Sequence, residues 1–310
     1  MTAQQQSAGK VTVVGSINID QAVRVERHPL PGETLLGSSI SLLPGGKGAN
    51  QALAAARLGA SVSLIGAVGN DAPAALATEL LEAAGVGLGA VRTVDGPTGL
   101  ALICVADDGE NTIVVIPGAN ASMDAQVVQA AAAQIAEAAV VVLQGEIPAG
   151  GIAAAARLAT GRVLLNLAPV VAVDAAVIRS ANPLVVNEHE GALVLSQLVP
   201  GAVAPADDEE LVAALRSQGI ASVVLTRGAQ GAICSDDAGT FLVPAPQINA
   251  VDSSGAGDAF VGALSARLAA GESLLDSSAF AARVGAFAVQ GHGTQTSYPR
   301  SSDALPDVAL

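Results

Sequence analysis

Short runs of apolar residues recur along most of this chain, and stretches rich in alanine separate them. The runs are Val11–Val14, Val62–Ile65, Val140–Leu143, Val163–Leu167, Leu184–Val186 and Val223–Thr226. Such continuous runs are typical of strands that are buried on both faces. The stretches Ala49–Leu58 and Ala72–Ala84 are each followed by glycine and are predicted to be helices. Repeated strand–helix units predict an α/β fold with three layers, in which helices cover both faces of a doubly wound, mostly parallel sheet.

Two segments carry a different pattern, in which apolar and polar residues alternate. In the first, Ala22–Val25 and Leu35–Leu43 surround the turn Pro29–Gly32, and in the second, Gly99–Val105 is joined to Asn111–Ile116 by a polar turn. Alternation predicts hairpin strands with one exposed face. We therefore expect a small β lid, formed by segments 21–43 and 99–116, that projects from a single domain spanning residues 10–304. Residues 1–9 are small and polar and are expected to be a disordered tail.

Composition narrows the class of protein. Residues of the hydrophobic types make up 51% of the chain but aromatic residues only 2%, which suits small helices packed closely on β-branched strands. The sequence has no apolar run of the roughly 20 residues that a membrane span needs, and no basic segment precedes Val11–Val14 as in a signal peptide. Cys104 and Cys234 have neither metal-site spacing nor a disulfide framework. We expect a soluble cytoplasmic protein without a membrane partner.

The net charge of −14 disfavours a nucleic-acid partner. Nucleic acids bind to a basic surface, and Lys and Arg form no cluster along this sequence. A negative field also opposes the approach of ATP. Any phosphate site must therefore rely on local dipoles, metal ions or single basic residues.

The segment Pro44–Ala52 reads PGGKGANQA and leads into a predicted helix. Its glycines let the backbone approach a ligand closely, and the first helical turn supplies free N–H donors. Lys47 in that turn opposes the helix dipole, which an ordinary glycine turn does not explain. The segment is not a Walker A loop, because Gly48 replaces the Ser or Thr that must follow the lysine. We predict a ligand site here.

The segment Val251–Phe260 reads VDSSGAGDAF and precedes a helix predicted over Asp258–Ala270. Gly255–Gly257 is expected to form a nest of backbone amides, where a transferring phosphoryl group meets positive potential. Asp258 then lies beside that group, in position to accept a proton from an attacking hydroxyl. An acid at a helix N-terminus is also common for structural reasons, so this motif alone leaves both interpretations open. A dinucleotide site fits poorly, because the segment lies far from the first strand.

Further polar residues stand near the carboxyl ends of predicted strands, where ligands bind in open α/β sheets. They are Asn18, Asp20, Glu146, Asn187 and Thr226. In Asn187–Glu190 an amide and a carboxylate share one helical face and can orient a hydrated Mg²⁺ or a phosphate. The same pattern is also that of an ordinary helix cap.

Together these segments resemble the signatures of the ribokinase-like (PfkB-type) carbohydrate kinases, and the likeness runs from about Val11 to Pro299. Gly45–Ala52 resembles the amino-terminal signature, Val251–Asp258 the carboxy-terminal one, and Asn187–Glu190 the Asn-x-x-Glu motif. The resemblance implies ATP-dependent phosphorylation of a small sugar, first of all D-ribose to ribose 5-phosphate, with Asp258 as general base. It also implies ATP, Mg²⁺ and K⁺ as cofactors and a homodimer formed through the lid.

The resemblance assigns roles to individual residues. Beside the base, the transferred group is expected at Gly255, Ala256 and Gly257. The sugar pocket is expected to comprise Asn18, Asp20, Gly46, Lys47, Asn50, Glu146 and Asp258. The nucleotide site is expected at Asn187, Thr226, Gly228, Gly231 and Gly257. Metal ions are expected near Glu190, Asp252, Ser254, Ala288, Gly291, Gly293 and Ser297.

Two features of the sequence leave alternatives open at these positions. Asp252 stands close to the expected phosphate and would repel it unless a cation neutralised the carboxylate, although Asp252 as a simple loop cap is the alternative. Around Ala281–Arg283 the chain has no His or Asn of the kind often seen near adenine in this family. Ser253–Ser254 stands where the family often has Thr-Thr or Thr-Ile.

Other functions remain as competing hypotheses. Fructose, deoxyribose and nucleosides are alternative substrates. A nucleoside base favours an apolar or aromatic surface, and the chain has four Phe, one Tyr and no Trp. A non-catalytic sugar-binding regulator is a remote alternative, which an intact Asp258 disfavours. A nicotinamide-dependent dehydrogenase would carry Gly-x-Gly-x-x-Gly where this chain has Val14–Asn18.

Overall fold

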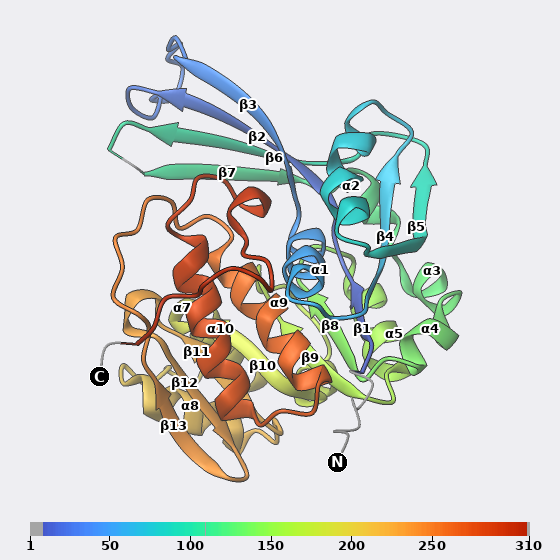
Figure 1. Ribbon diagram of the computed structural model, residues 1–310, viewed down its shortest axis with the longest axis vertical. Coiled ribbons are helices and arrows are strands. Elements are labelled where there is room, and N and C mark those ends of the chain that lie inside the picture. Colours follow the sequence, from blue (N-terminus) through green and yellow to red (C-terminus); the bar gives the residue numbers. More distant parts are fainter. Residues whose placement is uncertain (1–8, 109, 309–310) are drawn as a thin grey trace.

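The computed structural model describes residues 9–108 and 110–308, which form a large sheet, a small sheet and the helices around the large one (Figure 1). Within these residues the large sheet has the strand order β13-β12-β11-β10-β9-β8-β1-β4-β5. All pairs from β5 to β11 are parallel, and β12 and β13 add an antiparallel hairpin at one edge. The strands are β1 Val11–Val14, β4 Val62–Gly69, β5 Gly87–Val94, β8 Val140–Gln144, β9 Arg162–Asn166, β10 Ala181–Asn187, β11 Val223–Thr226, β12 Ala232–Asp236 and β13 Gly239–Val243.

Helices cover both faces of this sheet and form two separate core clusters with it. On β1, Val13 faces the cluster that contains α1, α2, α9 and α10, whereas Val14 faces the cluster that contains α3 to α8. The helices are α1 Lys47–Arg57, α2 Pro73–Ala83, α3 Ala125–Gln129, α4 Ala132–Ala136, α5 Ala149–Leu158, α6 Ala175–Arg179, α7 Glu188–Leu198, α8 Asp208–Ser217, α9 Ala256–Ala269 and α10 Leu274–Ala288. Short 3-10 turns are η1 Gly118–Ser122, η2 Gly228–Gln230 and η3 Gln295–Ser297. The predicted three-layer α/β fold is thus confirmed.

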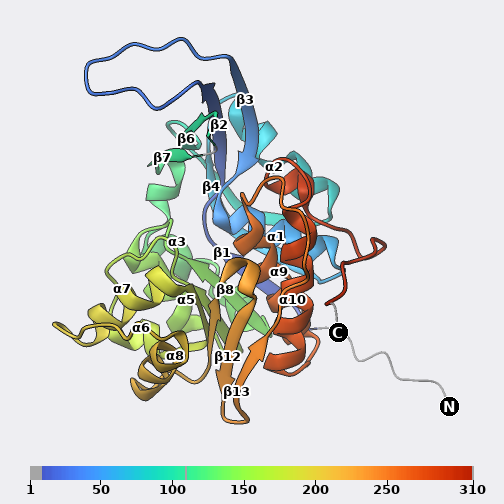
Figure 2. The ribbon, with the colours of Figure 1, turned by 90° about the vertical axis from the view of Figure 1, so that its left-hand side faces the viewer.

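The small sheet is the predicted lid, and it projects from one end of the body (Figure 1). Its strand order is β3-β2-β6-β7, and β2 pairs with β6 in parallel between two antiparallel pairs. The long connection between β2 and β3 extends farthest from the body (Figure 2). Its strands are β2 Asn18–Val25, β3 Ser39–Gly45, β6 Gly99–Ala106 and β7 Asn111–Ile116.

Several element boundaries differ from the sequence predictions. β3 begins at Ser39 rather than at Leu35, because Leu36 is 94% exposed and lies in an irregular loop. The strands β5, β12 and β13 were not predicted. β5 and β13 lie at the two edges of the large sheet, and exposed positions interrupt the apolar pattern along both. The prediction of a disordered tail lies outside the described residues except at Gly9, whose N–H donates to the Ala269 carbonyl at 2.8 Å.

Two helices begin two residues earlier than predicted, and both carry motif residues. α1 starts at Lys47 after Gly46, whose φ of +89° is left-handed and whose Cβ would lie 2.7 Å from the Asn18 nitrogen. α9 starts at Ala256 after Gly255, which has φ +72°. Of the three residues expected to form the amide nest before this helix, only Gly255 precedes α9. Asp258 lies within the first turn of α9. In the described part of the chain, none of the helices has the length and apolar character needed to cross a membrane.

Candidate active site

The motif residues meet where the carboxyl ends of the central strands face the lid. β1, β8, β10 and β11 all run in parallel, so the segments that follow them emerge at the same edge of the sheet. The N-terminal turns of α1 and α9 end at this edge too, and these two helices pack against each other. The topology thereby brings Lys47, Glu146 and Asp258 into one site from three distant parts of the sequence.

Asp258 is 6% exposed and both of its carboxylate oxygens are held by amides from α1. Nδ2 of Asn50 donates to Oδ2 of Asp258 at 2.9 Å, and Nε2 of Gln51 donates to Oδ1 at 2.8 Å. The carboxylate also lies in the first turn of α9, where the helix dipole favours negative charge. Asp258 is thus oriented from two sides.

The left-handed turn at Gly255 is fixed by the segment that follows η3. The Tyr298 hydroxyl donates to the Gly255 carbonyl at 3.0 Å, and a Cβ on Gly255 would lie 2.1 Å from Cγ2 of Thr294. Burial raises the pKa of Tyr298 well above its ordinary value, and the nearby charge of Asp258 raises it further. Tyr298 therefore remains a hydrogen-bond donor at physiological pH.

A cluster of acids surrounds the side chain of Lys47. Mainly the charge of Asp258 raises the pKa of Lys47, with further contributions from Glu146, Glu190 and Asp20, while burial opposes the shift. Burial raises the pKa of Asp20 to about 7, the charges of Glu146 and Asp258 add to this effect, and Lys47 opposes it. A cation among carboxylates, with one carboxyl that titrates near neutrality, is typical of a functional site.

The remaining residues of the expected sugar pocket are held by neighbours that the sequence did not single out. The Ser16 hydroxyl donates to Oε2 of Glu146 at 2.6 Å, and the Lys47 backbone N–H donates to the same oxygen at 3.0 Å. Nδ2 of Asn120 donates to Oδ1 of Asn18 at 2.7 Å. Ser16 and Asn120 therefore support the expected sugar pocket, and Ser16 had a signal in its position two residues after the first predicted strand.

A cavity of about 310 Å³ lies beside the start of α9. Of the residues expected at the nucleotide, Thr226, Gly228, Gly231 and Gly257 line it. One wall is apolar and includes Ile248, Phe260, Ala282, Ala286 and Val289. Such an apolar wall suits a flat base. It could contact the base without a His or Asn around Ala281–Arg283.

Asn187 and Glu190 form a reciprocal cap at the start of α7. Oδ1 of Asn187 accepts the Glu190 N–H at 2.8 Å, and Oε2 of Glu190 accepts the Asn187 N–H at 2.9 Å. The helix-cap interpretation of this motif is therefore present in the structure. Among the described residues, no group of three or more His, Cys, Asp and Glu is arranged to hold a metal ion. The charge of Glu190 contributes to the raised pKa of Lys47, so the two side chains are electrostatically coupled.

Asp252 joins the loop before α9 to the glycine-rich segment that follows α10. Its Oδ1 accepts the Ser254 N–H and its Oδ2 accepts the Gly293 N–H, each at 2.9 Å. Burial opposes ionisation, but these hydrogen bonds outweigh it and hold the pKa of Asp252 below its ordinary value. Of the residues expected near a metal in this segment, Gly293 is hydrogen-bonded to Asp252. Asp252 therefore has the geometry of a loop cap.

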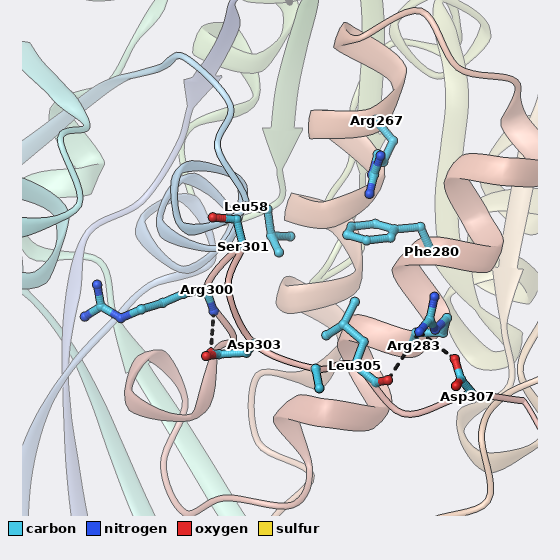
Figure 3. Close-up of a pocket in the computed structure, with 10 residues that line it drawn as sticks. Leu58, Arg267, Phe280, Arg283, Arg300, Ser301, Asp303, Leu305 and Asp307 are labelled. Carbon is cyan, nitrogen blue, oxygen red and sulfur yellow. Dashed lines mark hydrogen bonds and ion pairs between the residues drawn. The ribbon is translucent and has the colours of Figure 1, made fainter.

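A second, larger cavity of about 450 Å³ lies between the C-terminal ends of α1 and α9, helix α10 and residues 300–307 (Figure 3). Three arginines line it although Lys and Arg form no cluster in the sequence. Arg267 lies 3.7 Å from the centre of the Phe280 ring and pairs with Glu272 at 2.7 Å. Arg283 pairs with Asp307 at 2.7 Å, and in Figure 3 the Arg300 side chain points away from Phe280. Two of these arginines form ion pairs with acidic side chains and are less available to a phosphate. The cavity beside α9 is therefore the better candidate site.

Known proteins resemble the chain over nearly its full length. The model of the pfkB family of carbohydrate kinases matches residues 8–301. Ribokinase of Schizosaccharomyces pombe is 38% identical over 304 residues, covering 93% of this chain and 94% of that protein. Deoxyribokinase of Salmonella typhi is 32% identical, covering 93% of this chain and 95% of that protein.

Solved structures agree with this similarity. A crystal structure of ribokinase from Thermotoga maritima has a TM-score of 0.87 and 29% identity, covering 94% of this chain and 97% of that one. A structure of Arabidopsis thaliana ribokinase complexed with ribose and ATP has a TM-score of 0.82 and 30% identity, covering 95% and 96% of the two chains. With its fold, its site geometry and its full-length relatives in agreement, this chain belongs to the pfkB family of carbohydrate kinases.

Proposed function

We propose that this protein is a ribokinase, which transfers the γ-phosphoryl group of ATP to the 5-hydroxyl of D-ribose. The observation that carries the proposal is Asp258, a buried carboxylate held by two amides between the acidic cluster at Lys47 and the cavity lined by Gly257. The relative from Schizosaccharomyces pombe is a ribokinase, and the Arabidopsis ribokinase binds ribose and ATP. Both similarities support ribose and ATP as the substrates here.

In the proposed mechanism, Asp258 accepts the proton of the sugar hydroxyl as its oxygen attacks the γ-phosphorus. A new oxygen–phosphorus bond forms, the bond to the bridging oxygen breaks, and ADP leaves. Backbone N–H groups at the start of α9 and the ammonium of Lys47 stabilise the charge on the transferring group. Asn18, Asp20, Gly46, Asn50 and Glu146 are proposed to hold the sugar. Asn187, Thr226, Gly228 and Gly231 are proposed to hold the nucleotide.

Two metal ions belong to this proposal. Glu190 with Asn187 would orient a hydrated Mg²⁺, because Glu190 is electrostatically coupled to Lys47 and uses only one carboxylate oxygen in the helix cap. Mg²⁺ supplies charge neutralisation at the phosphates. Asp252 and Ser254, with carbonyls of the segment 288–297, would form an all-oxygen set that suits K⁺. Each Asp252 oxygen accepts one N–H and keeps a further lone pair, so the loop cap and a cation are compatible.

We also propose that the lid forms a homodimer. β7 is an edge strand whose residues are all exposed, among them Ile113, Val114 and Val115. An exposed apolar edge invites pairing with another strand, and a second copy of the lid offers the same edge.

A coupled assay of ADP release across a panel of sugars tests the proposed function. We expect D-ribose to give the highest kcat/KM. Deoxyribose lacks one hydroxyl, so a buried partner stays unpaired and kcat/KM should fall by about 10- to 100-fold. Higher activity with deoxyribose, fructose or a nucleoside would reassign the substrate within the family. Sugar binding by calorimetry without phosphorylation of any sugar would instead indicate a non-catalytic regulator.

The affinity for ribose should depend on pH through Asp20. Because the pKa of Asp20 is raised to about 7, the carboxyl gains a proton as the pH falls through neutrality and then loses part of its capacity as an acceptor. Affinity should therefore drop below about pH 7 and level off above it. Asp20→Asn should bind ribose about 10- to 100-fold more weakly, without this pH dependence, and should bind ATP normally.

The raised pKa of Asp20 also affects the free energy of unfolding of the protein without ligand. The folded protein keeps the Asp20 proton to a higher pH than the unfolded chain, so Asp20 lowers the free energy of unfolding as the pH rises from about 4 to about 7. Asp20→Asn should thus raise the unfolding midpoint at about pH 8.

A ribose affinity that is equal in variant and parent at every pH would exclude Asp20 from the sugar site.

A further inference from the structure

A connected chain of buried side-chain amides holds Asp258 in place. On one side, Nε2 of Gln144 donates to Oε1 of Gln51 at 2.7 Å, and Nε2 of Gln51 donates to Asp258 at 2.8 Å. On the other side, Nε2 of Gln295 donates to Oδ1 of Asn50 at 2.9 Å, and Nδ2 of Asn50 donates to Asp258 at 2.9 Å. All four amide side chains are at most 4% exposed. The segments that supply them, β8, α1 and η3, lie far apart in the sequence.

The order of these hydrogen bonds fixes which end of each amide faces the carboxylate. An amide has one acceptor oxygen and one donor nitrogen, so a flip reverses both of its contacts. If Gln51 flipped, its oxygen would face the Asp258 carboxylate and its nitrogen would face the donor nitrogen of Gln144. Nε2 of Gln51 is also 3.0 Å from Oδ1 of Asn166, a second acceptor that the flipped oxygen would oppose. Asn166 is itself fixed, because its Nδ2 donates to the Val185 carbonyl at 3.0 Å, and it therefore holds Gln51 as a donor.

We propose that Gln51, held as a donor by Asn166, is a positioning residue that keeps the Asp258 carboxylate in the orientation needed for proton transfer. The proposal rests on the proposed role of Asp258 as the base. Asn50 alone leaves rotation about the Asp258 side chain possible, because it holds only Oδ2, whereas Gln51 holds Oδ1 and so fixes the plane of the carboxylate. Gln51 acts on the reaction only through Asp258.

Gln51→Met tests the proposal, because methionine has a similar length but no donor. We expect kcat to fall by about 10- to 100-fold, the scale of a misplaced catalytic group. The dissociation constants for ribose and ATP should stay within about twofold, since Gln51 is not expected to touch either ligand. In a double-mutant cycle, Gln51→Met should have no further effect on the residual kcat of Asp258→Asn.

The matched control is Gln197→Met, which removes an amide that bonds the backbone of Val171 and Val173 away from the site. Its kcat should equal that of the parent. If Gln51→Met fails to fold, Gln144→Met gives the same cycle one hydrogen bond farther from the carboxylate. A kcat that is unchanged in Gln51→Met, or that falls equally in both Asp258 backgrounds, would overturn the proposal. Failure of Asp258→Asn to lower kcat would overturn the proposed base instead, so the two failures are distinguishable.

Discussion

Asp258→Asn should lower the kcat of ribose phosphorylation by about 10²–10⁴-fold, the usual range for a positioned general base. The replacement keeps the size of the side chain but removes the proton acceptor. Steady-state kinetics with saturating Mg²⁺-ATP measure the loss of kcat. Calorimetry measures the affinities for ribose and ATP, which should stay close to those of the parent.

The amide chain predicts a second property of this variant. The introduced asparagine side chain has one acceptor oxygen where the carboxylate has two. Gln51 must stay a donor, because its Nε2 also faces Oδ1 of Asn166, so Nδ2 of Asn50 loses its acceptor. Asp258→Asn should therefore also lower the free energy of unfolding by about 1–3 kcal/mol, the cost of an unpaired buried polar group. The control Asp174→Asn alters the cap of α6, outside the site, and should leave kcat unchanged. Near-normal turnover in Asp258→Asn would remove this residue from the role of base.

The strands of the core were predictable because their burial on both faces leaves apolar runs in the sequence. β11 matches its prediction residue for residue, and Val11–Val14 forms β1 as expected. The edge hairpin of β12 and β13 was not recognised, since alternating exposure along β13 weakens the apolar signal. β5 lies at the opposite edge and was missed for the same reason. Sequence patterns thus identify central strands more readily than edges.

The motifs at the candidate site were recognisable, but the side chains that support them were not. Gln51 is part of the amino-terminal motif, yet its role depends on Gln144 and Asn166, which are distant in sequence. Nothing in the neighbourhood of a glutamine tells which other amide will meet it after folding. Tyr298 is a similar case, because its bond to the Gly255 carbonyl joins η3 to the start of α9 only in the folded chain. Such contacts require the tertiary structure.

Gly255→Ala and Gly257→Ala should both impair turnover, but only Gly255→Ala should lower the free energy of unfolding. Gly255 has φ +72°, and a Cβ there would lie 2.1 Å from Cγ2 of Thr294 and 2.6 Å from the Tyr298 hydroxyl. The left-handed backbone costs alanine about 1–2 kcal/mol, and the contact with Thr294 adds to it. Gly255→Ala should lower the free energy of unfolding by about 2–4 kcal/mol and kcat by about 10²-fold, because the start of α9 shifts.

Gly257 is the matched control for this argument, since it lies two residues away in the first turn of α9. A Cβ there meets nothing within 4 Å, and the position lines the cavity proposed for the nucleotide. Alanine is the better helix former, so Gly257→Ala should leave the free energy of unfolding equal or raise it by up to about 1 kcal/mol. Its methyl group would occupy space next to the phosphates, so the KM for ATP should rise by about tenfold or more while ribose affinity is kept.

Chemical denaturation together with kinetics in ATP separates the two effects. Gly255 would then be required by the shape of the backbone, and Gly257 by the close approach of the phosphate. If Gly257→Ala bound ATP as the parent does, the phosphates would not pass this turn of α9, and the proposed placement of the nucleotide would be wrong. If Gly255→Ala were as stable as the parent, the left-handed turn held by Tyr298 would not be what fixes the start of α9 and, with it, the position of Asp258.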